Sequence, residues 1–431
     1  MRSILFVFVC SISFFNSFGQ NGWTVCNAPS FSGSRIDDLF MVNAQVGYAV
    51  SGDGKIVKTT DGGDNWTLLI STPGVYNRSV EFINTQKGFV GSFSSSASAA
   101  VNILRRTTDG GTTWTDITSL LPVKARKGIC GLSIPDSNTI YGGGNWFQDS
   151  GYIVKSVDGG NSWNLIDMSA YSSSIIDMFF INKDTGFVTG KGKLPLETGI
   201  ILYTTDGGVT WSQKYQGTDG NEYCWKIQRL SKLVWFASLE NNGNIAPKVM
   251  RSDDGGMTWK RLDVALAGTG GHNIEGVGFI DPKHGWTGGD TRTYETKDGG
   301  ITWEIIPVCP YMNRVFRLND TTMLATGQQI WKYNGTGTFP AIPPTRYVWM
   351  KCHPNPVKDI LTMDVALSVP TRVHIIIYDQ NGHRVKVVEN ADKPKGSYNY
   401  YLNTNGLQPG VYYVVLKTHE DKGTVKFVVS Q

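Results

Sequence analysis

An all-β protein of two domains is predicted by three observations in this sequence of 431 residues. First, a nine-residue unit such as KTTDGGDNW, residues 58–66, occurs six times. Second, short stretches of alternating apolar residues, separated by Asn, Asp and Gly, fill the intervals between the copies. Third, a Pro-rich segment at 340–344 ends the repeats, and a different pattern of alternating residues follows.

The repeated unit has a nearly fixed period. Each copy begins with two alternating stretches joined by a polar turn, as in LFMVNAQVGYAV (39–50). A third alternating stretch such as KIVKTT (55–60) follows, and a fourth starts at the Trp. Hairpin-connected strands explain this pattern, four to a copy. The first Asp of the copies is Asp61, Asp109, Asp158, Asp206, Asp254 and Asp298, at intervals of 48, 49, 48, 48 and 44 residues. A four-stranded unit of this length is typical of a β-propeller blade.

Seven blades are predicted in residues 20–339. The stretch 314–335 repeats the first three strands, but Gly335 stands where the Asp would be and no Trp strand follows. At the other end of the repeats, NGWT (21–24) matches DNWT (64–67) and has no strands of its own before it. We therefore expect the strand at Trp23 to complete the last blade, a closure that removes open sheet edges.

The repeated motif carries a family resemblance. Its pattern, Ser/Thr-x-Asp-x-Gly-x-Thr-Trp, resembles the Asp-box or BNR repeat, which occurs in sialidases, xyloglucan-active endoglucanases, sortilin-type receptors and photosystem II assembly-factor-like propellers. The stretch GYAVSGDGKIVKTTDGGDNW (47–66) is most similar to the last group. The resemblance implies that the boxes lie at the propeller rim, away from the ligand face.

The six box aspartates are interpreted as structural. A carboxylate in such a turn accepts hydrogen bonds from backbone amides of the same turn, and Gly63 and its equivalents allow a positive φ. The Trp that follows can bury a large apolar face between blades. We expect the turn to stabilise each blade and to take no part in chemistry.

Residues 340–350 are predicted to be a linker and residues 351–431 a small β-sandwich. Alternating stretches in this tail are joined by Asn-Gly and Pro-Gly turns. The tail resembles the type A C-terminal sorting domain of type IX secretion substrates from Bacteroidetes. The matching residues are Pro354-Asn355-Pro356, Asp379 to Gly382, Leu407-Gln408-Pro409-Gly410-Val411-Tyr412, Lys422 and Lys426. The resemblance implies that residues 351–431 engage the type IX machinery and that the protein is secreted or held at the cell surface.

The first residues support export. Residues 1–19 combine one Arg, an apolar run and small residues, which is typical of a signal peptide. No later run is apolar and long enough for a membrane span. Five cysteines remain in the mature chain without paired spacing, so we expect free buried thiols and neither a metal site nor a cofactor. A net charge of +4 is too small to indicate a nucleic-acid partner.

Candidate ligand residues come from aligning the innermost strands of the blades. At one aligned position, the seven strands have Asp38, Ser79, Cys130, Asp177, Lys226, Gly276 and Arg314. The residues Asp37, Arg78, Trp225 and Glu275 precede this position in four of the strands. We predict ligand contacts by Asp38, Asp177, Trp225, Lys226, Glu275 and Arg314, because propeller ligands meet the central channel. The alternatives are that the polar ring solvates a wet channel or that Asp37, Asp38 and Asp177 perform acid–base work. Trp225, Trp146 and Trp286 are either sugar platforms or packing residues.

Two known enzyme types fit poorly. A sialidase resemblance would require Arg-Ile-Pro near the first blade, but Asp37 follows Arg35-Ile36 here, and the further arginines are missing. The xyloglucan-active enzymes use a cleft between two propellers, and this chain has one. We therefore expect a secreted or cell-surface propeller that binds a protein or glycan without catalysis; the alternative is a glycan-active hydrolase that uses the channel aspartates.

Overall fold

A computed structural model describes residues 22–31, 33–94, 102–144, 150–193, 195, 197–241, 246–264, 273–335, 348–367, 370–394, 396–418 and 422–430. The chain forms two compact units, residues 1–229 with 233–336 and residues 337–431 with 230–232. The signal peptide predicted at 1–19, the linker residues 340–347 and Trp146 lie outside the described residues.

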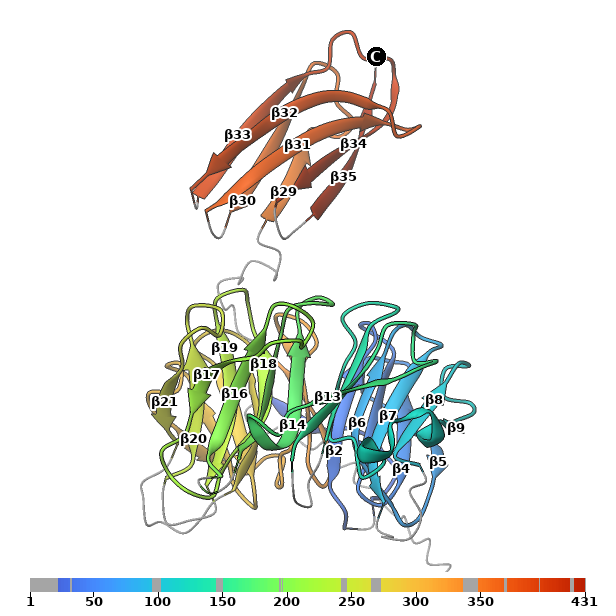
Figure 1. The fold of residues 1–431 in the computed structure, drawn as a ribbon. Helices are drawn as coiled ribbons and strands as arrows, with labels where there is room; N and C mark the ends of the chain where they lie inside the picture. The colour runs from blue at the N-terminus through green and yellow to red at the C-terminus, as the bar shows by residue number, and fades with distance from the viewer. Residues whose placement is uncertain are drawn as a thin grey trace, which may run out of the picture. The chain divides into compact units, whose positions relative to one another are not determined.

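Seven four-stranded antiparallel sheets make up the first unit, which confirms the predicted propeller (Figure 1). We number the blades 1 to 7 from β2 onward. The first strands are β2 (Ile36–Met41), β6 (Val75–Phe82), β10 (Gly131–Ser133), β14 (Ser172–Phe180), β18 (Glu222–Arg229), β22 (Ile274–Phe279) and β26 (Arg314–Arg317). The second strands are β3 (Gly47–Ser51), β7 (Gly88–Ser94), β11 (Ile140–Gly144), β15 (Gly186–Gly192), β19 (Trp235–Asn241), β23 (Gly285–Gly289) and β27 (Thr322–Thr326).

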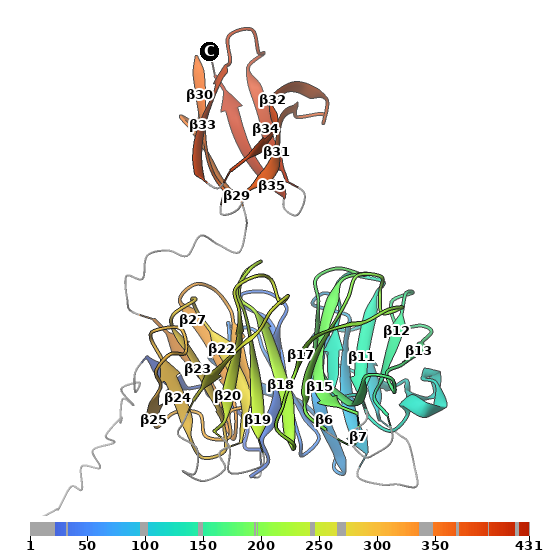
Figure 2. The ribbon, with the colours of Figure 1, turned by 60° about the vertical axis from the view of Figure 1, so that its left-hand side comes forward.

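The remaining strands form the outer half of each blade. The third strands are β4 (Lys55–Thr59), β8 (Leu104–Thr107), β12 (Tyr152–Ser156), β16 (Gly199–Thr204), β20 (Lys248–Ser252), β24 (Thr293–Thr296) and β28 (Ile330–Asn334). The fourth strands are β5 (Thr67–Ser71), β9 (Thr115–Asp116), β13 (Asn164–Asp167), β17 (Ser212–Gln216), β21 (Lys260–Asp263), β25 (Glu304–Ile306) and, for blade 7, β1 (Trp23–Val25). Two 3-10 turns, η1 (Thr118–Leu120) and η2 (Val123–Ala125), separate β9 from β10. In Figure 2 the strands of this unit run between two faces of loops.

The N-terminal strand closes the propeller, as predicted. β1 pairs antiparallel with β28, so that Trp23 lies opposite Tyr333. The Trp23 ring is fully buried and lies edge-on to Trp286 of blade 6, with 5.2 Å between the ring centroids. The closing strand therefore contributes a core side chain as well as backbone hydrogen bonds.

Aromatic stacking joins neighbouring blades and explains the repeated Gly-aromatic pairs. Tyr48 of blade 1 stacks on Phe82 of blade 2 with 3.7 Å between the centroids. The Phe82 ring lies over Gly88 of its own blade, where a Cβ would be only 2.5 Å from ring atoms. Blades 3 and 4 and blades 5 and 6 repeat the stack at 3.6 and 3.5 Å, through the pairs Tyr141–Phe180 and Phe236–Phe279.

The Asp-box turn has the predicted geometry. Asp61 Oδ1 accepts hydrogen bonds from the backbone N–H of Asn65 at 3.0 Å and from the Thr59 hydroxyl at 2.8 Å. Gly62 and Gly63 have φ of +77° and +97°, which only glycine adopts without strain. The Trp66 indole N–H donates to the Gly63 carbonyl at 2.9 Å. The box carboxylates are half-exposed or exposed, so these hydrogen bonds belong to the rim and not to the core.

Each box turn is also tied to the first hairpin of its blade. In blade 1 the Gly62 N–H donates to the Gln45 carbonyl at 2.9 Å. Blade 7 has lost its box, yet the Gly335 N–H makes the same kind of bond with Thr321 at 2.8 Å. The boxes and the carboxyl ends of the first strands therefore share one face of the propeller, which we call the box face.

Replacing Asp61 tests the structural interpretation of the boxes. The backbone N–H of Asn65, with its side-chain amide, holds the pKa of Asp61 at about 2. A depressed carboxyl pKa adds stability above the unfolded-state value near 4, and this stability is lost as the pH falls towards 2. We expect Asp61→Ala to lower the free energy of unfolding by about 1 kcal/mol at pH 7 and by less at pH 2. Denaturant titrations at the two pH values measure the difference.

The control for this experiment is Asp263→Ala, which removes an exposed carboxylate at the end of an outer strand. Exposed pairs contribute little to stability, so this variant should unfold like the parent. Equal losses in the two variants would contradict the assignment.

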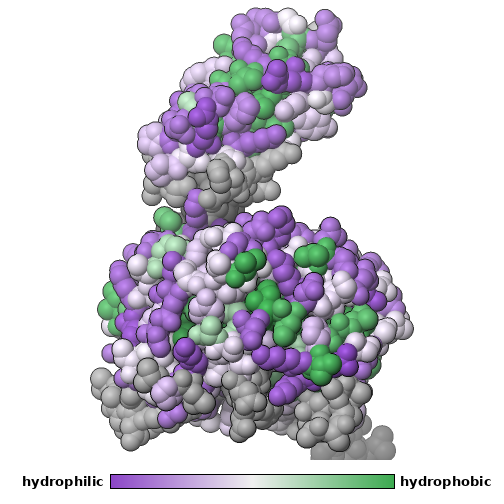
Figure 3. Space-filling view, in the orientation of Figure 1, coloured by the Kyte–Doolittle hydropathy of each residue, from purple (hydrophilic) through white to green (hydrophobic). Residues whose placement is uncertain are grey.

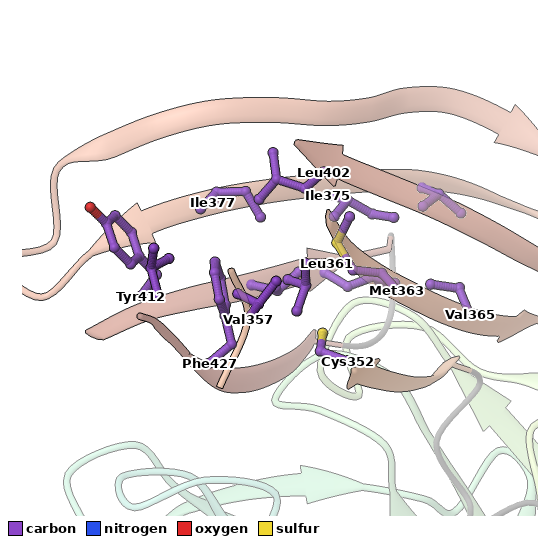
Figure 4. Close-up of a cluster of buried hydrophobic side chains, with 14 of the residues drawn as sticks. Cys352, Val357, Leu361, Met363, Val365, Ile375, Ile377, Leu402, Tyr412 and Phe427 are labelled. Atoms are coloured by element: carbon purple, nitrogen blue, oxygen red, sulfur yellow. The ribbon is translucent and has the colours of Figure 1, made fainter. Parts of the chain in front are cut away.

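The second unit is a two-layer β-sandwich, as predicted. One sheet has the order β29 (Val348–His353), β30 (Ile360–Leu367), β33 (Gly396–Asn403), and the other β32 (Arg384–Lys393), β31 (Thr371–Asp379), β34 (Gly410–Lys417), β35 (Lys422–Val429). Buried side chains from the two sheets, including Leu361, Met363, Ile375, Ile377 and Phe427, meet between them (Figure 4). β29 begins at Val348, three residues before the predicted start, because Val348 to Lys351 pair with β30.

All five cysteines in the described residues are free and buried, in agreement with the expected thiols. Figure 3 shows that hydrophobic residues on the drawn face occur in small groups among hydrophilic ones.

Candidate functional site

The predicted polar ring is brought together by Arg314, which reaches across the channel from blade 7. Its Nε lies 2.5 Å from Asp38 Oδ1 of blade 1. Its two terminal nitrogens donate to the two carboxylate oxygens of Asp177 in blade 4, each at 3.1 Å. One guanidinium therefore joins three blades in the middle of the channel.

Asp38 and Asp177 each also accept a hydrogen bond from the backbone of the next blade. Asp38 Oδ2 accepts the backbone N–H of Val80 in blade 2 at 3.0 Å, and Asp177 Oδ2 accepts that of Ile227 in blade 5 at 3.1 Å. Burial alone would raise the pKa of Asp177, but the charges of Arg314 and Lys226 outweigh it and lower that pKa. Lys226 is buried beside them, and burial together with the Arg314 charge lowers the pKa of its ammonium group.

A second charged group lies nearer the amino ends of the first strands. Asp37 is fully buried and accepts hydrogen bonds from Arg35 at 2.8 Å and from Arg78. Arg35 in turn bridges to Glu275 of blade 6, with 2.5 Å between Nη1 and Oε1, and Glu275 accepts from Asn313 of blade 7. Blades 1, 2, 6 and 7 are thus linked by ion pairs and hydrogen bonds at this level.

Arg78 connects this group to blade 5. Its guanidinium lies 5.2 Å from the ring of Trp225 in blade 5, within cation–π range. The indole N–H of Trp225 donates to Glu240. Burial, with a contribution from the nearby charge of Glu275, raises the pKa of Glu240 to about 8.

β-bulges explain how consecutive residues of one strand reach the channel. The pairing of the first and second strands shifts register between Ile36 and Asp38, between Asn77 and Ser79, between Cys224 and Ile227, and between Ile274 and Gly276. The residues inside these shifts are Asp37, Arg78, Trp225, Lys226 and Glu275. A bulge leaves such a residue outside the regular alternation and redirects its side chain.

A cavity of about 300 Å³ lies in the channel. Asp38 and Arg314 belong to its lining, and every blade contributes to the wall. The further lining residues belong to the carboxyl halves of the first strands and include Phe40, Glu81, Phe179, Arg229 and Arg317. Since these strand ends lead into the first hairpins, the cavity lies towards the box face.

The alignment missed Glu81 and Glu240 as channel groups. Glu81 lies two positions after Ser79 in blade 2, and at the same level three other blades have Phe40, Phe179 and Phe316. The sequence could have indicated this channel group, because a Glu stands at a position where those three blades have Phe. Burial raises the pKa of Glu81 to about 8, and a hydrogen bond from the backbone N–H of Ile134 offsets this only in part.

The predicted ligand residues are buried or half-buried. Trp286 is fully buried, and its indole N–H donates to Glu295 at 3.1 Å, so it packs between blades 6 and 7. Asp38, Asp177, Trp225, Lys226 and Glu275 are buried, and Arg314 is half-buried. Among the described residues no group of three His, Cys, Asp or Glu side chains is arranged to hold a metal ion.

Two segments of the chain match known family models. Residues 351–430 match the secretion system C-terminal sorting domain, and residues 202–213 match the BNR/Asp-box repeat. The C-terminal domain is a secretion sorting domain. It marks the protein for type IX secretion to the cell surface or the extracellular space. None of the helices in the described ranges is long and apolar enough to cross a membrane.

The signature residues of the sorting domain make defined contacts. Asn355 accepts the backbone N–H of Val428 at 2.9 Å and donates to the Lys426 carbonyl at 3.1 Å, which fixes the Pro-Asn-Pro segment to the last strand. Asp379 accepts the backbone N–H groups of Asn381 and His383 in its turn.

Solved structures support the fold of the first unit. YCF48 bound to D1 peptide is 17% identical, with a TM-score of 0.54 over 73% of this chain and 98% of that one. YCF48 from Cyanidioschyzon merolae is 18% identical with the same score and coverage. U3-55K is 10% identical, with a TM-score of 0.53 over 74% of this chain and 99% of that one. These identities are evidence for the propeller fold alone. No curated protein matches the chain.

Proposed function

We propose that this protein is a secreted or cell-surface propeller that binds a protein or glycan ligand and does not catalyse a reaction. The observation that carries the proposal is the Arg314 bridge. It occupies the carboxylates of Asp38 and Asp177, two of the three aspartates considered for acid–base chemistry. The third, Asp37, is fully buried beneath Arg35 and Arg78.

A glycoside hydrolase makes different demands on its carboxylates. It needs one acid and one base or nucleophile that both reach the scissile bond. An aspartate of this channel could do so only by giving up a buried ion pair, which costs several kcal/mol. YCF48, a propeller of the same fold, has a solved structure with a bound D1 peptide. This complex supports a binding role for the present propeller.

A glycan array with a parallel hydrolysis assay tests the proposal on the full-length mature protein. We expect retention of at least one glycan, or of a surface protein in a companion binding assay, without product formation. Turnover of a bound glycan that is abolished by Asp177→Asn or Asp38→Asn in folded protein would overturn the non-catalytic assignment in favour of the hydrolase.

The sorting domain predicts a separable export function. In a host with type IX machinery, we expect residues 348–431 fused to a foreign periplasmic protein to direct it to the surface or medium. The physical reason is that this unit has its own two sheets and its own buried core. Fractionation followed by immunoblotting measures the distribution.

The matched variant deletes residues 348–431 from the present protein. We expect this truncated chain to accumulate in the periplasm. Normal amounts of truncated protein in the medium would contradict the assignment of the export signal to this domain.

A further inference from the structure

The outer face of the sheet β32–β31–β34–β35 in the sorting domain is apolar. The core side chains of β31 and β34 alternate along each strand; they are Val373, Ile375, Ile377, Tyr412, Val414 and Leu416. The residues between them point outwards, and they include Ile376, Tyr378, Tyr413 and Val415. Strand pairing places Ile376 opposite Val415 and Tyr378 opposite Tyr413, so the four side chains lie next to one another.

The two flanking strands extend this apolar face. Val387 of the edge strand β32 lies opposite Ile376 and is 41% exposed. On the other side, Val411 of β34 lies opposite Val428 of β35, and both are half-buried. We call the seven residues the outer patch: Ile376, Tyr378, Val387, Val411, Tyr413, Val415 and Val428.

The other sheet of the sandwich has a polar outer face. Asp364 of β30 is 2.8 Å from the His353 ring nitrogen and accepts a hydrogen bond from Asn399, also at 2.8 Å. Figure 2 shows the two sheets as separate layers. An antiparallel sheet with one face in water usually alternates apolar and polar residues, whereas apolar residues on both faces are typical of a sheet covered on both sides. The outer patch therefore indicates a partner.

The family signature lies on the same sheet as the outer patch. The turn from Asp379 to Gly382 joins β31 to β32, and the segment from Leu407 to Tyr412 leads into β34. Lys422 and Lys426 belong to β35, and the Pro354-Asn355-Pro356 segment is fixed to β35 through Asn355. None of these residues belongs to β29, β30 or β33. The features that the domain shares with other sorting domains are thus concentrated on this sheet.

Exposed cations border the outer patch. Arg384 lies opposite Tyr378, Lys426 lies opposite Tyr413, and Lys417 ends β34. All three are exposed, and in the described part of the chain none of them makes an ion pair. A complementary partner therefore has an apolar surface bordered by carboxylates.

The size of the face fits a transient contact. Four strands of about eight residues cover roughly 19 Å by 26 Å, or about 500 Å². A stable protein–protein interface buries about 800 Å² on each partner, so this face belongs to the smaller, short-lived class. Such a contact suits a substrate that passes through an export machinery.

We propose that the outer patch is the surface by which this protein docks on the type IX machinery, against an apolar protein surface bordered by carboxylates. The proposal rests on the export role of the sorting domain. The partner covers the outward tyrosine and valine side chains, and its carboxylates pair with Arg384, Lys417 and Lys426.

Export of full-length variants in a host with type IX machinery tests the proposal. Val387→Asp places a carboxylate on the outer patch, and the control Tyr401→Asp places one on β33, the edge strand of the other sheet; the parent side chains are 41% and 68% exposed. Because an apolar partner cannot bury an unpaired carboxylate without a large cost, we expect Val387→Asp to reduce surface and medium protein by about tenfold. Tyr401→Asp should be exported like the parent.

Immunoblots of the periplasmic, surface and medium fractions measure the effect, and thermal unfolding of the purified variants checks that they fold. If Val387→Asp unfolds at a lower temperature than the parent, Val387→Thr, which has almost the same shape, replaces it with the same expected direction. Normal export of the folded Val387 variant, or equal losses in the Val387 and Tyr401 variants, would overturn the proposal.

A second pair of variants tests the cationic border. Arg384→Glu reverses a charge beside Tyr378, and the control Lys358→Glu reverses an exposed charge between β29 and β30. We expect the export of Arg384→Glu to fall by about fivefold and that of Lys358→Glu to stay unchanged. Equal export of these two variants would also overturn the proposal.

Measurements on purified protein distinguish other occupants of the outer patch. Flotation with vesicles of phosphatidylethanolamine and phosphatidylglycerol, and the mass from light scattering, should be the same for the parent and Val387→Asp. Vesicle binding or dimerisation that is lost in Val387→Asp would assign the patch to a membrane or to a second copy of the chain, and would overturn the proposal.

The deletion of residues 348–431 separates this proposal from the export role itself. Normal export of the truncated chain would refute the export role of the domain. Blocked export of the truncated chain together with normal export of folded Val387→Asp would refute only the docking patch.

Discussion

Arg314→Met is expected to lower the free energy of unfolding of the propeller by about 3–5 kcal/mol, the usual result of breaking a buried ion pair by removing one partner. The substitution leaves Asp38 and Asp177 buried without their shared cation. It also removes the side chain that joins blade 7 to blades 1 and 4. Denaturant unfolding of the full-length protein, followed by Trp fluorescence, measures the loss.

The matched test also neutralises the carboxylates of Asp38 and Asp177. The triple variant Arg314→Met, Asp38→Asn, Asp177→Asn removes both carboxylates that the single variant leaves without Arg314, and it leaves Lys226 as the buried ionisable group beside them. We expect it to recover part of the lost stability, because the measured cost of breaking a buried pair comes largely from the charge left behind. A loss below about 1 kcal/mol in the single variant would mean that the bridge does not hold the channel together.

Deleting residues 21–27 is expected to destabilise the whole propeller and not only blade 7. The deletion removes β1, which pairs with β28, and the fully buried ring of Trp23. Loss of a buried Trp side chain alone costs about 3–5 kcal/mol. We therefore expect the melting temperature to fall by about 10 °C or more, measured by calorimetry.

The deleted strand can be added back as a separate peptide. A synthetic peptide of residues 21–27 should raise the melting temperature of the deletion variant in a concentration-dependent way, since it binds the folded form. The same peptide with Ala in place of Trp23 serves as the control and should have little effect. An unchanged melting temperature in the deletion variant would refute closure by β1.

The architecture was predictable because it repeats. Six Asp-Gly-Gly turns at nearly equal spacing define the blades, and the Trp at position 23 marks the strand that closes the last one. Local rules suffice here: Gly62 and Gly63 adopt a positive φ, and Asp61 bonds to its own turn. The sorting domain was predictable from its resemblance to known sorting domains, which is carried by motifs such as Pro354-Asn355-Pro356 and Asp379 to Gly382.

The channel was predictable only in part. Alignment of the first strands placed Asp38, Asp177 and Arg314 at one level, and the structure has them in contact. The alignment also placed Asp37, Arg78 and Trp225 beside this level, but it did not predict the contacts among them, because each lies in a β-bulge and alternation along a strand says nothing about an added residue.

The sequence by itself determined the all-β class, the number of blades, the closing strand and the box turns, since each follows from the period of the repeat or from contacts within a few residues. The export domain followed from its resemblance to known sorting domains. Only the tertiary structure decided which channel charges pair. Arg314 and Asp177 are 137 residues apart and lie on blades that are not neighbours. Their pairing depends on the curvature that closes seven sheets into a ring, and on burial, which makes an unpaired charge too costly to leave.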